Sequence, residues 1–354
     1  MLRMRNQLLT QNASSAAGVV GWMAAIQAQD YYGALLSVGV RSGLDQSRVI
    51  AALESRKIIR TWPHRGTLHF VLAEDAAWMT ALSAPRIIRN AARRREQLGL
   101  SDKDLVAAQD IIVRELQSGE LTRPELLEKL ELAGQATKAG RGYHILAHSA
   151  QRGLTYIGPM RGKQQTFGLL SNLPVKQRRL EDDEARAELL RRYMMSHGPA
   201  TLKDFMWWSG MTNGEAKPAL EEIKASLASF AYAGQEYWLS KDSFDRVSTL
   251  PPPPKIMLLA GFDEYILGYN VREPQLSQAD FMKIVPGGNG VFHPTLLVDG
   301  RVAGIWRRTL KGGKRPVAHI TFEYFAKLPA SVEVEVRQAV ATYGNFLGMP
   351  TVLQ

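Results

Sequence analysis

The sequence predicts an α+β protein in which three winged-helix (helix-turn-helix) units in tandem are followed by a C-terminal β-barrel. Three observations predict this fold. A pattern of two helices and a two-stranded hairpin occurs three times, a run of prolines then interrupts the chain, and short strands dominate the sequence after it. We therefore expect domains at residues 1–100, 101–180, 181–250 and 251–354, the last ending in a helix.

The clearest copy of the pattern occupies residues 201–240. Thr201, with an acidic residue three positions later, has the signature of a helix start, and Gly210 ends that helix. Thr212 repeats the signature and begins a second helix after a short turn. Aromatic residues then alternate with small or polar ones around residues 233–236, which predicts a hairpin. Two helices followed by a hairpin are typical of a winged helix.

The second copy begins at Gly119, and Thr122 is again followed three positions later by a glutamate. The helix that starts there is expected to close at Gly134, and residues 143–152 form the next helix. Apolar segments on both sides of residues 158–163 predict a second hairpin with a turn-rich, basic tip.

The first copy is less regular. Residues 15–29 are expected to be helical, Asp45 caps a second helix, and strands flank a turn at residues 63–66. Three copies with the same order, each ending in a hairpin, are hard to obtain by chance, so we interpret them as a tandem array.

A different organisation follows residues 251–255, PPPPK, which form a stiff polyproline-type spacer and mark a domain boundary. The segments KIMLLAGFDEYILGY, VFHPTLLVDGRVAGIWRR and PVAHITFEY have the apolar or alternating pattern of strands, and Asp299-Gly300 is a hairpin signal. An amphipathic helix at residues 332–346 is expected to cover the edge of this sheet. These features predict a small barrel with a terminal helix.

The composition favours a polyanionic partner, because 44 Lys and Arg residues face 34 Asp and Glu, a net charge of +10. The absence of cysteine excludes disulfides, a thiol nucleophile and cysteine-held zinc or iron–sulfur sites. No apolar run is long enough to cross a membrane, and the start MLRMRNQLLTQ lacks signal-peptide features. We therefore expect a soluble cytoplasmic protein, associated with the nucleoid, that binds no membrane.

The recurring winged helices make double-stranded DNA the expected polyanion, since the second helix of such a unit usually enters the major groove while the wing holds phosphates. The arginine-rich residues 86–97 can hold phosphates in the same way, although a solvated helix face is the alternative interpretation. For each candidate DNA contact, plain surface charge is the alternative. The candidates are Arg60, His64 and Arg65 in the first hairpin, Arg141 and Arg152 around the second helix of the second unit, and Arg161 and Lys163 on its wing.

Other chemistries find little support in the sequence. His144 and His148 have helical spacing but no flanking acidic residue, so we expect no metal site. No glycine-rich phosphate loop of the nucleotide-binding kind occurs, so we expect no cofactor. The pair Asp263-Glu264 is interpreted as a turn or helix cap rather than a catalytic pair.

Gln27 and Gln29 flank Ala28 near the expected end of the first apolar helix. On a continuous helix they would lie about 200° apart, so they point together only if the helix ends or distorts here. Gly33 makes such an ending plausible. The alternative interpretation is a solvent-facing helix terminus whose glutamines cap free carbonyls.

At these residues the chain resembles the AlkZ/YcaQ family of winged-helix DNA glycosylases, which excise N7-alkylated purines and unhook interstrand crosslinks. IQAQDYYGA resembles the family's Gln-x-Gln catalytic segment and TLHFV its Thr-Leu-His strand. LLAGFDEYILGYNVRE and LLVDGRVAGIW resemble its C-terminal barrel. The resemblance implies that Gln27 and Gln29 are catalytic, and Gln29 places the chain nearer the AlkZ branch, because the YcaQ branch carries Asp at that position.

Neutral amides suit the implied reaction. N7 alkylation makes the purine a cationic leaving group, so a strong general acid is dispensable, and bond cleavage builds positive charge on the sugar. Gln27 and Gln29 would position a water molecule and face that charge. The motif contains no lysine, which argues against a Schiff-base lyase step and for a monofunctional glycosylase of base excision repair that leaves an abasic site. We expect the protein to be a monomer.

Bulky crosslinked bases do not swing easily into a tight slot, so we expect an open channel rather than a base-flipping pocket. The competing interpretation is a non-catalytic DNA-binding protein such as a transcription regulator, which usually needs dimer symmetry that three unlike units do not supply. A third interpretation is an enzyme that acts on RNA, although the sequence lacks the stacking motifs of RNA-binding modules.

Overall fold

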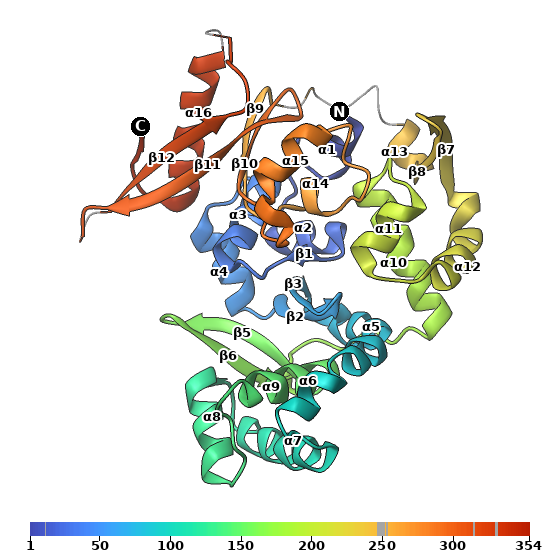
Figure 1. Ribbon diagram of the computed structural model, residues 1–354, viewed down its shortest axis with the longest axis vertical. Coiled ribbons are helices and arrows are strands. Elements are labelled where there is room, and N and C mark those ends of the chain that lie inside the picture. Colours follow the sequence, from blue (N-terminus) through green and yellow to red (C-terminus); the bar gives the residue numbers. More distant parts are fainter. Residues whose placement is uncertain (11, 246–251, 253, 314–315, 330–331) are drawn as a thin grey trace. The chain divides into compact units, whose positions relative to one another are not determined.

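A computed structural model describes residues 1–354 except 11, 246–251, 253, 314–315 and 330–331 (Figure 1). The chain divides into two compact units. Unit 1 contains Met1–Ile50 and Ala187–Gln354, and unit 2 contains Ala51–Arg186. The four domains expected from the sequence remain a prediction.

Unit 2 packs helices against an antiparallel sheet. Within it the strand order is β3-β2-β5-β6-β4. A buried apolar core joins α7, α8 and α9 to the sheet and includes Ile112, Leu126, Leu146 and Phe167. The elements are β2 (Ile58–His64), β3 (Thr67–Leu72), α5 (Ala76–Asn90), α6 (Ala92–Gln97), α7 (Asp102–Leu116), β4 (Leu121–Thr122), α8 (Arg123–Leu132), α9 (Arg141–Gln151), β5 (Thr155–Arg161) and β6 (Gln164–Leu169), with short 3₁₀ turns at Ala73–Asp75 and Leu170–Asn172.

The chain enters and leaves unit 2 through helices α4 and α10. Unit 1 contains the N-terminal helices, the pair α11 and α12 with its hairpin, and a second sheet. Its elements are α1 (Leu2–Asn6), α2 (Ala16–Met23), β1 (Ile26–Gln27), α3 (Tyr31–Ser42), α4 (Gln46–Glu54), α10 (Asp182–His197), α11 (Leu202–Ser209), α12 (Asn213–Ile223), β7 (Leu227–Tyr232), β8 (Gln235–Ser240), α13 (Lys241–Asp245), β9 (Ile256–Leu259), α14 (Glu264–Leu267), α15 (Gln278–Ile284), β10 (Thr295–Val298), β11 (Arg301–Lys311), β12 (Val317–Tyr324), α16 (Glu333–Leu347) and β13 (Thr351–Leu353), with 3₁₀ turns at Lys224–Ser226 and Pro286–Gly288.

The capping signals in the sequence correctly located the helix starts. Thr122, Thr201 and Thr212 each form a capping box with the acidic residue three positions later. The Asp45 carboxylate accepts the Arg48 amide at the start of α4. Such boxes satisfy backbone N–H groups that the first turn leaves without helical partners, so they act locally and can be predicted locally.

The hairpins also follow local sequence. The two-residue turns Arg65-Gly66, Ala233-Gly234 and Asp299-Gly300 all have positive φ at both positions, the geometry that suits tight hairpins. The second hairpin differs from its prediction, because residues 158–161 belong to β5 and only Gly162-Lys163 form the turn. Its pairing shifts register between Ile157 and Met160, so the predicted turn residues are accommodated within the strand.

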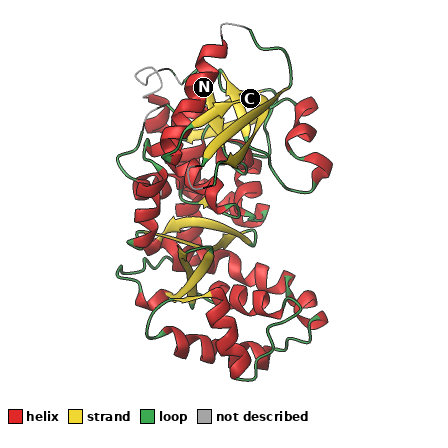
Figure 2. Cartoon of the chain, turned by 90° about the vertical axis from the view of Figure 1, so that its left-hand side faces the viewer, coloured by secondary structure: helices red, strands yellow, loops and turns green. Residues whose placement is uncertain are grey.

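The C-terminal sheet is open where a barrel was expected. Its order is β13-β12-β11-β10-β9, with β12 and β13 parallel and the other pairs antiparallel. The strands near the C label in Figure 2 belong to this sheet. Helix α16 carries the chain to the far edge beyond β12, so β13 extends the sheet instead of closing it against β9. The predicted terminal helix is confirmed, and its Tyr343 packs on Trp306 of β11 with ring centroids 4.9 Å apart.

The segment KIMLLAGFDEYILGY, expected to form strand, does so only in its first part. It leaves the sheet after Leu259 and forms the short helix α14. The predicted proline spacer at residues 251–255 lies partly outside the described residues, since Pro251 and Pro253 are not among them.

Candidate active site

The first apolar helix ends earlier than the sequence suggested. Helix α2 begins at its cap Ser15 and ends at Met23, and Ala24, with φ of 64°, turns the backbone out of the helix. Gln27 therefore lies on the extended segment β1. Short apolar runs fit a buried strand as well as a helix, which explains why periodicity misassigned residues 24–29. Gly33 lies inside α3 and ends no helix.

The break in the helix brings the two glutamines into contact. The Gln27 side-chain oxygen Oε1 accepts the backbone N–H of Gln29 at 3.0 Å. Because an N–H group needs an acceptor, this contact fixes the Gln27 amide with its oxygen toward Gln29. Gln27 is 5% exposed, whereas Gln29 is an exposed residue, so the pair lies where a buried segment emerges.

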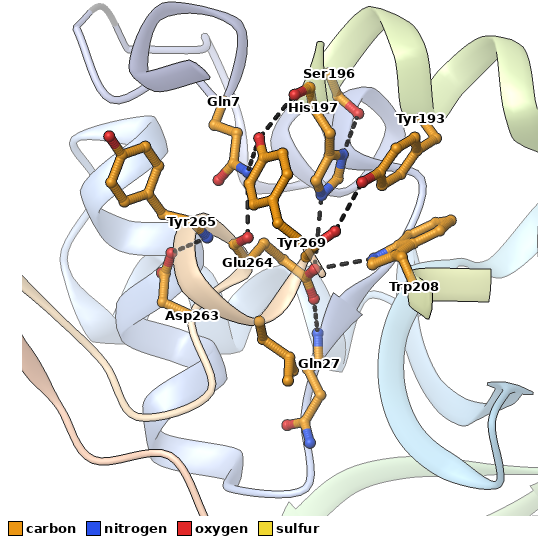
Figure 3. Close-up of polar contacts among 12 residues, drawn as sticks. Gln7, Gln27, Tyr193, Ser196, His197, Trp208, Asp263, Glu264, Tyr265 and Tyr269 are labelled. Atoms are coloured by element: carbon orange, nitrogen blue, oxygen red, sulfur yellow. Dashed lines mark hydrogen bonds and ion pairs between the residues drawn. The ribbon is translucent and has the colours of Figure 1, made fainter. Parts of the chain in front are cut away.

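A buried carboxylate holds the backbone of Gln27. Glu264 Oε1 accepts the Gln27 N–H at 2.9 Å, and Oε2 accepts the indole N–H of Trp208 at 2.9 Å (Figure 3). The ring of His197 places Nε2 3.6 Å from the same Oε2. The Glu264, Trp208 and His197 side chains are all fully buried. Sequence analysis missed this cluster, since its members come from distant parts of the chain.

The neighbouring residue Asp263 has the capping role expected of it. Its Oδ1 accepts the backbone N–H of Tyr265 at the start of α14. Two nitrogens of the Arg41 guanidinium donate to the Asp263 carboxylate, one to each oxygen, both at 2.8 Å. The hydroxyl of Ser37 donates to Asp263 Oδ2 at 2.7 Å. Burial alone would raise the pKa of Asp263, but the Arg41 guanidinium and the hydrogen bonds from the Tyr265 N–H and the Ser37 hydroxyl together hold that pKa below its usual value. The charged pair anchors the start of α14.

His197 is buried in the same cluster, against Tyr193 with ring centroids 4.5 Å apart. Burial lowers its pKa, although the nearby Glu264 carboxylate acts in the opposite direction. Its Nδ1 lies 2.9 Å from the hydroxyl oxygen of Ser196. The His197 ring is therefore neutral at neutral pH and packs against the other buried side chains of the cluster.

The structure separates the candidate DNA contacts of unit 2 into buried and accessible groups. Arg60 and His64 are buried, and the ring centroid of His64 lies 4.1 Å from that of His69. Arg65 is half-buried. Arg141 donates to the backbone carbonyls of Leu98, Gly99 and Ala136. These contacts give it a structural role at the start of α9.

The remaining three candidates are exposed. Arg152 follows α9, Lys163 lies in the β5–β6 turn, and Arg161 pairs with Glu125 at 3.2 Å. An exposed ion pair of this kind is weak and screened by salt, so Arg161 can exchange the carboxylate for a phosphate. In the arginine-rich helices, Arg93 and Arg94 are exposed as well.

The predicted histidine pair of α9 is structural. Gln109 Nε2 lies 2.8 Å from His148 Nδ1, which makes the amide the donor and the neutral ring the acceptor. Burial, with Arg95 and Arg152, lowers the pKa of His148 to about 4. Over the described part of the chain, no group of three His, Cys, Asp or Glu side chains is placed to hold a metal ion.

A pH dependence follows from His148. Because its folded pKa of about 4 lies below the ordinary 6.5, its contribution to the free energy of unfolding is complete above pH 6.5 and is lost as the pH falls toward 4. The variant His148→Gln keeps an acceptor for Gln109 without titrating. Urea unfolding at a series of pH values should show a shallower decline for this variant between pH 6.5 and 4. Parallel curves for the two proteins would contradict the assignment.

Among the described residues, no helix combines the length and apolar character needed to cross a membrane.

Comparison with known proteins gives three findings. The model of a family described as DNA glycosylase AlkZ-like matches residues 20–346. An interstrand DNA cross-link repair glycosylase of Streptomyces sahachiroi is 27% identical over 329 residues, covering 86% of this chain and 85% of that protein. The solved structure of Streptomyces sahachiroi DNA glycosylase AlkZ has a TM-score of 0.81 and 24% identity, covering 100% of this chain and 97% of that one. The predicted resemblance and the mixed α+β fold are confirmed.

Proposed function

The chain belongs to the DNA glycosylase AlkZ-like family of DNA-repair enzymes, and on this premise we propose that it hydrolyses the N-glycosidic bond of N7-alkylated purines in duplex DNA, leaving an abasic site. The observation that carries the proposal is the fixed amide of Gln27, whose oxygen faces Gln29 where the buried segment reaches the surface. A relative named for repair of interstrand crosslinks makes crosslinked N7-alkylated purines a second proposed substrate.

The geometry suits a positioning role for the two glutamines. A carbonyl oxygen has two lone pairs, so Gln27 Oε1 can accept from Gln29 and from a water molecule together. The Gln29 side chain would hold the same water from the exposed side. Held in this way, the water attacks the sugar carbon as positive charge develops there, while the bond from that carbon to the purine nitrogen breaks and its electron pair leaves with the alkylated base, which departs neutral without needing a proton. The proton that the attacking water loses passes to bulk solvent. No lysine lies in residues 24–34, which favours a hydrolytic reaction without a lyase step.

Duplex DNA is the proposed partner of the helix-helix-hairpin arrangements. We interpret α8–α9–β5–β6 and α11–α12–β7–β8 as winged helices. The third proposed copy is assigned by sequence order alone, with the N-terminal helices followed by the hairpin β2–β3. In this interpretation Arg152, Arg161 and Lys163 contact phosphates, because they are exposed on or beside the second wing. The enzyme would act as a monomer on one duplex.

A duplex carrying a single N7-methylguanine tests the proposed reaction. Incubation with the protein followed by alkali should break the damaged strand at that guanine, since abasic sites are alkali-labile. A duplex with an N7-to-N7 alkyl crosslink should release separable strands. Tight binding of the methylated duplex without strand breakage would favour the non-catalytic DNA-binding protein instead.

The exposed cations beside the second wing give a separate prediction. Removing the charge of Lys163 or Arg152 by alanine should weaken binding of undamaged duplex and lower the slope of log K against log salt by about 0.9 for each phosphate that the variant no longer neutralises. Arg337→Ala is the matched control, because Arg337 is an exposed arginine of α16 paired with Glu333 at 2.7 Å. Identical slopes for Lys163→Ala, Arg152→Ala and the control would assign these residues to plain surface charge.

A further inference from the structure

We propose that Glu264 is a positioning residue for excision, and that its carboxylate sets the place of Gln27 through the Gln27 backbone. The inference rests on the proposed function of Gln27. It starts from the bond of 2.9 Å between Glu264 Oε1 and the Gln27 N–H, which joins residues 237 positions apart. Segment β1 consists of only two residues after an abrupt helix end, so this long-range bond contributes to fixing its position.

The carboxylate is itself held on several sides. Trp208 donates its indole N–H to Oε2, and the side chain is fully buried, so the carboxylate does not exchange these donors for bulk water. The backbone carbonyl of Glu264 accepts from Gln7 Nε2 at 3.2 Å and from the Gly268 N–H at 2.9 Å. The adjacent Asp263 is anchored to Arg41. Glu264 is therefore a rigid acceptor.

Gln27 is fixed at two points as a result. Glu264 holds its backbone N–H, and its side-chain oxygen accepts the N–H of Gln29. Each of the two side-chain oxygens of Glu264 accepts a different donor, the Gln27 N–H at one and the Trp208 indole N–H at the other, so neither oxygen can turn away without losing a buried hydrogen bond. A misplacement of about 1 Å can cost on the order of 10²-fold in rate, so this restraint matters for a reaction that depends on holding water.

The variant Glu264→Gln tests the restraint with little change in shape. Its amide has one oxygen, so either the Gln27 N–H or the Trp208 N–H must face an NH₂ group. In single-turnover assays on N7-methylguanine duplex at saturating enzyme, we expect the excision rate to fall by roughly 10-fold to 10²-fold. The dissociation constant for the duplex should stay unchanged, because Glu264 is buried away from it.

A second substitution should restore the rate. In the double variant Glu264→Gln with Trp208→Phe, the indole donor is gone, so the amide oxygen can turn to the Gln27 N–H. We expect the double variant to excise at least about 5-fold faster than Glu264→Gln, a positive coupling measured against both single variants. A purely structural role predicts the reverse, since the second substitution adds a further defect in the core.

The matched control is Asp204→Asn. Asp204 is a fully buried carboxylate of unit 1 that accepts the backbone N–H groups of Asn270 and Val271 and does not touch Gln27. Its folded fraction should excise at the wild-type rate, although the variant loses stability. A slow Asp204→Asn would show that any buried carboxylate of this unit has the same effect, which would overturn the proposal.

The outcomes separate this inference from the proposed function. A wild-type excision rate in Glu264→Gln, or no recovery of the rate in the double variant, would overturn the positioning role of Glu264. In that case a slow Gln27→Ala would still uphold the proposed function. Full activity in Gln27→Ala would overturn both. If Glu264→Gln does not fold, hydrogen exchange in the intact protein decides: strong protection of the Gln27 N–H supports the restraint, and exchange at the rate of an open amide rejects it.

Discussion

Replacing Gln27 with alanine should lower the excision of N7-methylguanine by about 10²-fold to 10³-fold, the loss typical of removing a preorganised polar group from an active site. The substitution removes the side-chain atoms that hold the water from the buried side in the proposed mechanism. It leaves the backbone N–H on Glu264 and the fold of β1 in place. Single-turnover excision rates at saturating enzyme measure the effect.

Binding provides the internal control for this variant. Gln27 is buried, so Gln27→Ala should bind the duplex with nearly wild-type affinity and the same salt dependence. Gln29→Ala should show a loss in the same direction, because the two residues are in contact and would hold the same water in the proposed mechanism. The double variant should fall little further than the worse single variant. Normal excision by both single variants would show that the catalytic residues lie elsewhere.

Replacing Arg41 with methionine should lower the free energy of unfolding by about 3–5 kcal/mol, because it leaves the Asp263 carboxylate buried without its cation. Both side chains have no exposed surface, and their closest N···O distance is 2.8 Å. Arg41 also donates to the side chain of Gln7, the residue that follows α1, at 2.8 Å, so this contact is lost too. Urea unfolding of unit 1 measures the change.

The exposed pair of Arg48 and Asp45 is the matched control for this variant. Its atoms are 3.7 Å apart and the Arg48 side chain is 71% exposed, so Arg48→Met should cost no more than about 1 kcal/mol. Adding Asp263→Asn to Arg41→Met removes the stranded charge and should recover part of the loss. If Arg41→Met were as stable as Arg48→Met, the conclusion that the Arg41–Asp263 pair anchors α14 would be wrong.

Local signals in the sequence predicted more of the fold than of the site. Thr122, Thr201 and Thr212 cap helices through atoms only three residues away, and Asp299-Gly300 turns a hairpin by its own backbone preference. The end of α2 is different, because the apolar run after Met23 suits a buried strand as well as a helix. Barrel closure likewise depended on where β13 pairs, which no local pattern decides.

The glutamines could be singled out only through the resemblance to a family. Their spacing alone favoured an ordinary helix terminus, and the Asp263-Glu264 pair looked like a cap. Half of that interpretation is confirmed, since Asp263 caps α14. Glu264 contacts Gln27 across 237 residues, a separation at which a single sequence carries no pairing signal.

Unit 1 is built from two segments that are far apart in the sequence, Met1–Ile50 and Ala187–Gln354, and this affects how it forms during synthesis on the ribosome. The first segment leaves the ribosome well before its partners, and at usual elongation rates the wait is on the order of tens of seconds. Unit 2, continuous in sequence, can fold during that interval. Asn6 donates to the carbonyl of Gly198, so this contact must wait until more than half of the chain has been made, and the contact of Gln27 with Glu264 must wait until the last quarter emerges. The nascent protein can thus acquire its proposed DNA-contacting wing before it can cut a glycosidic bond.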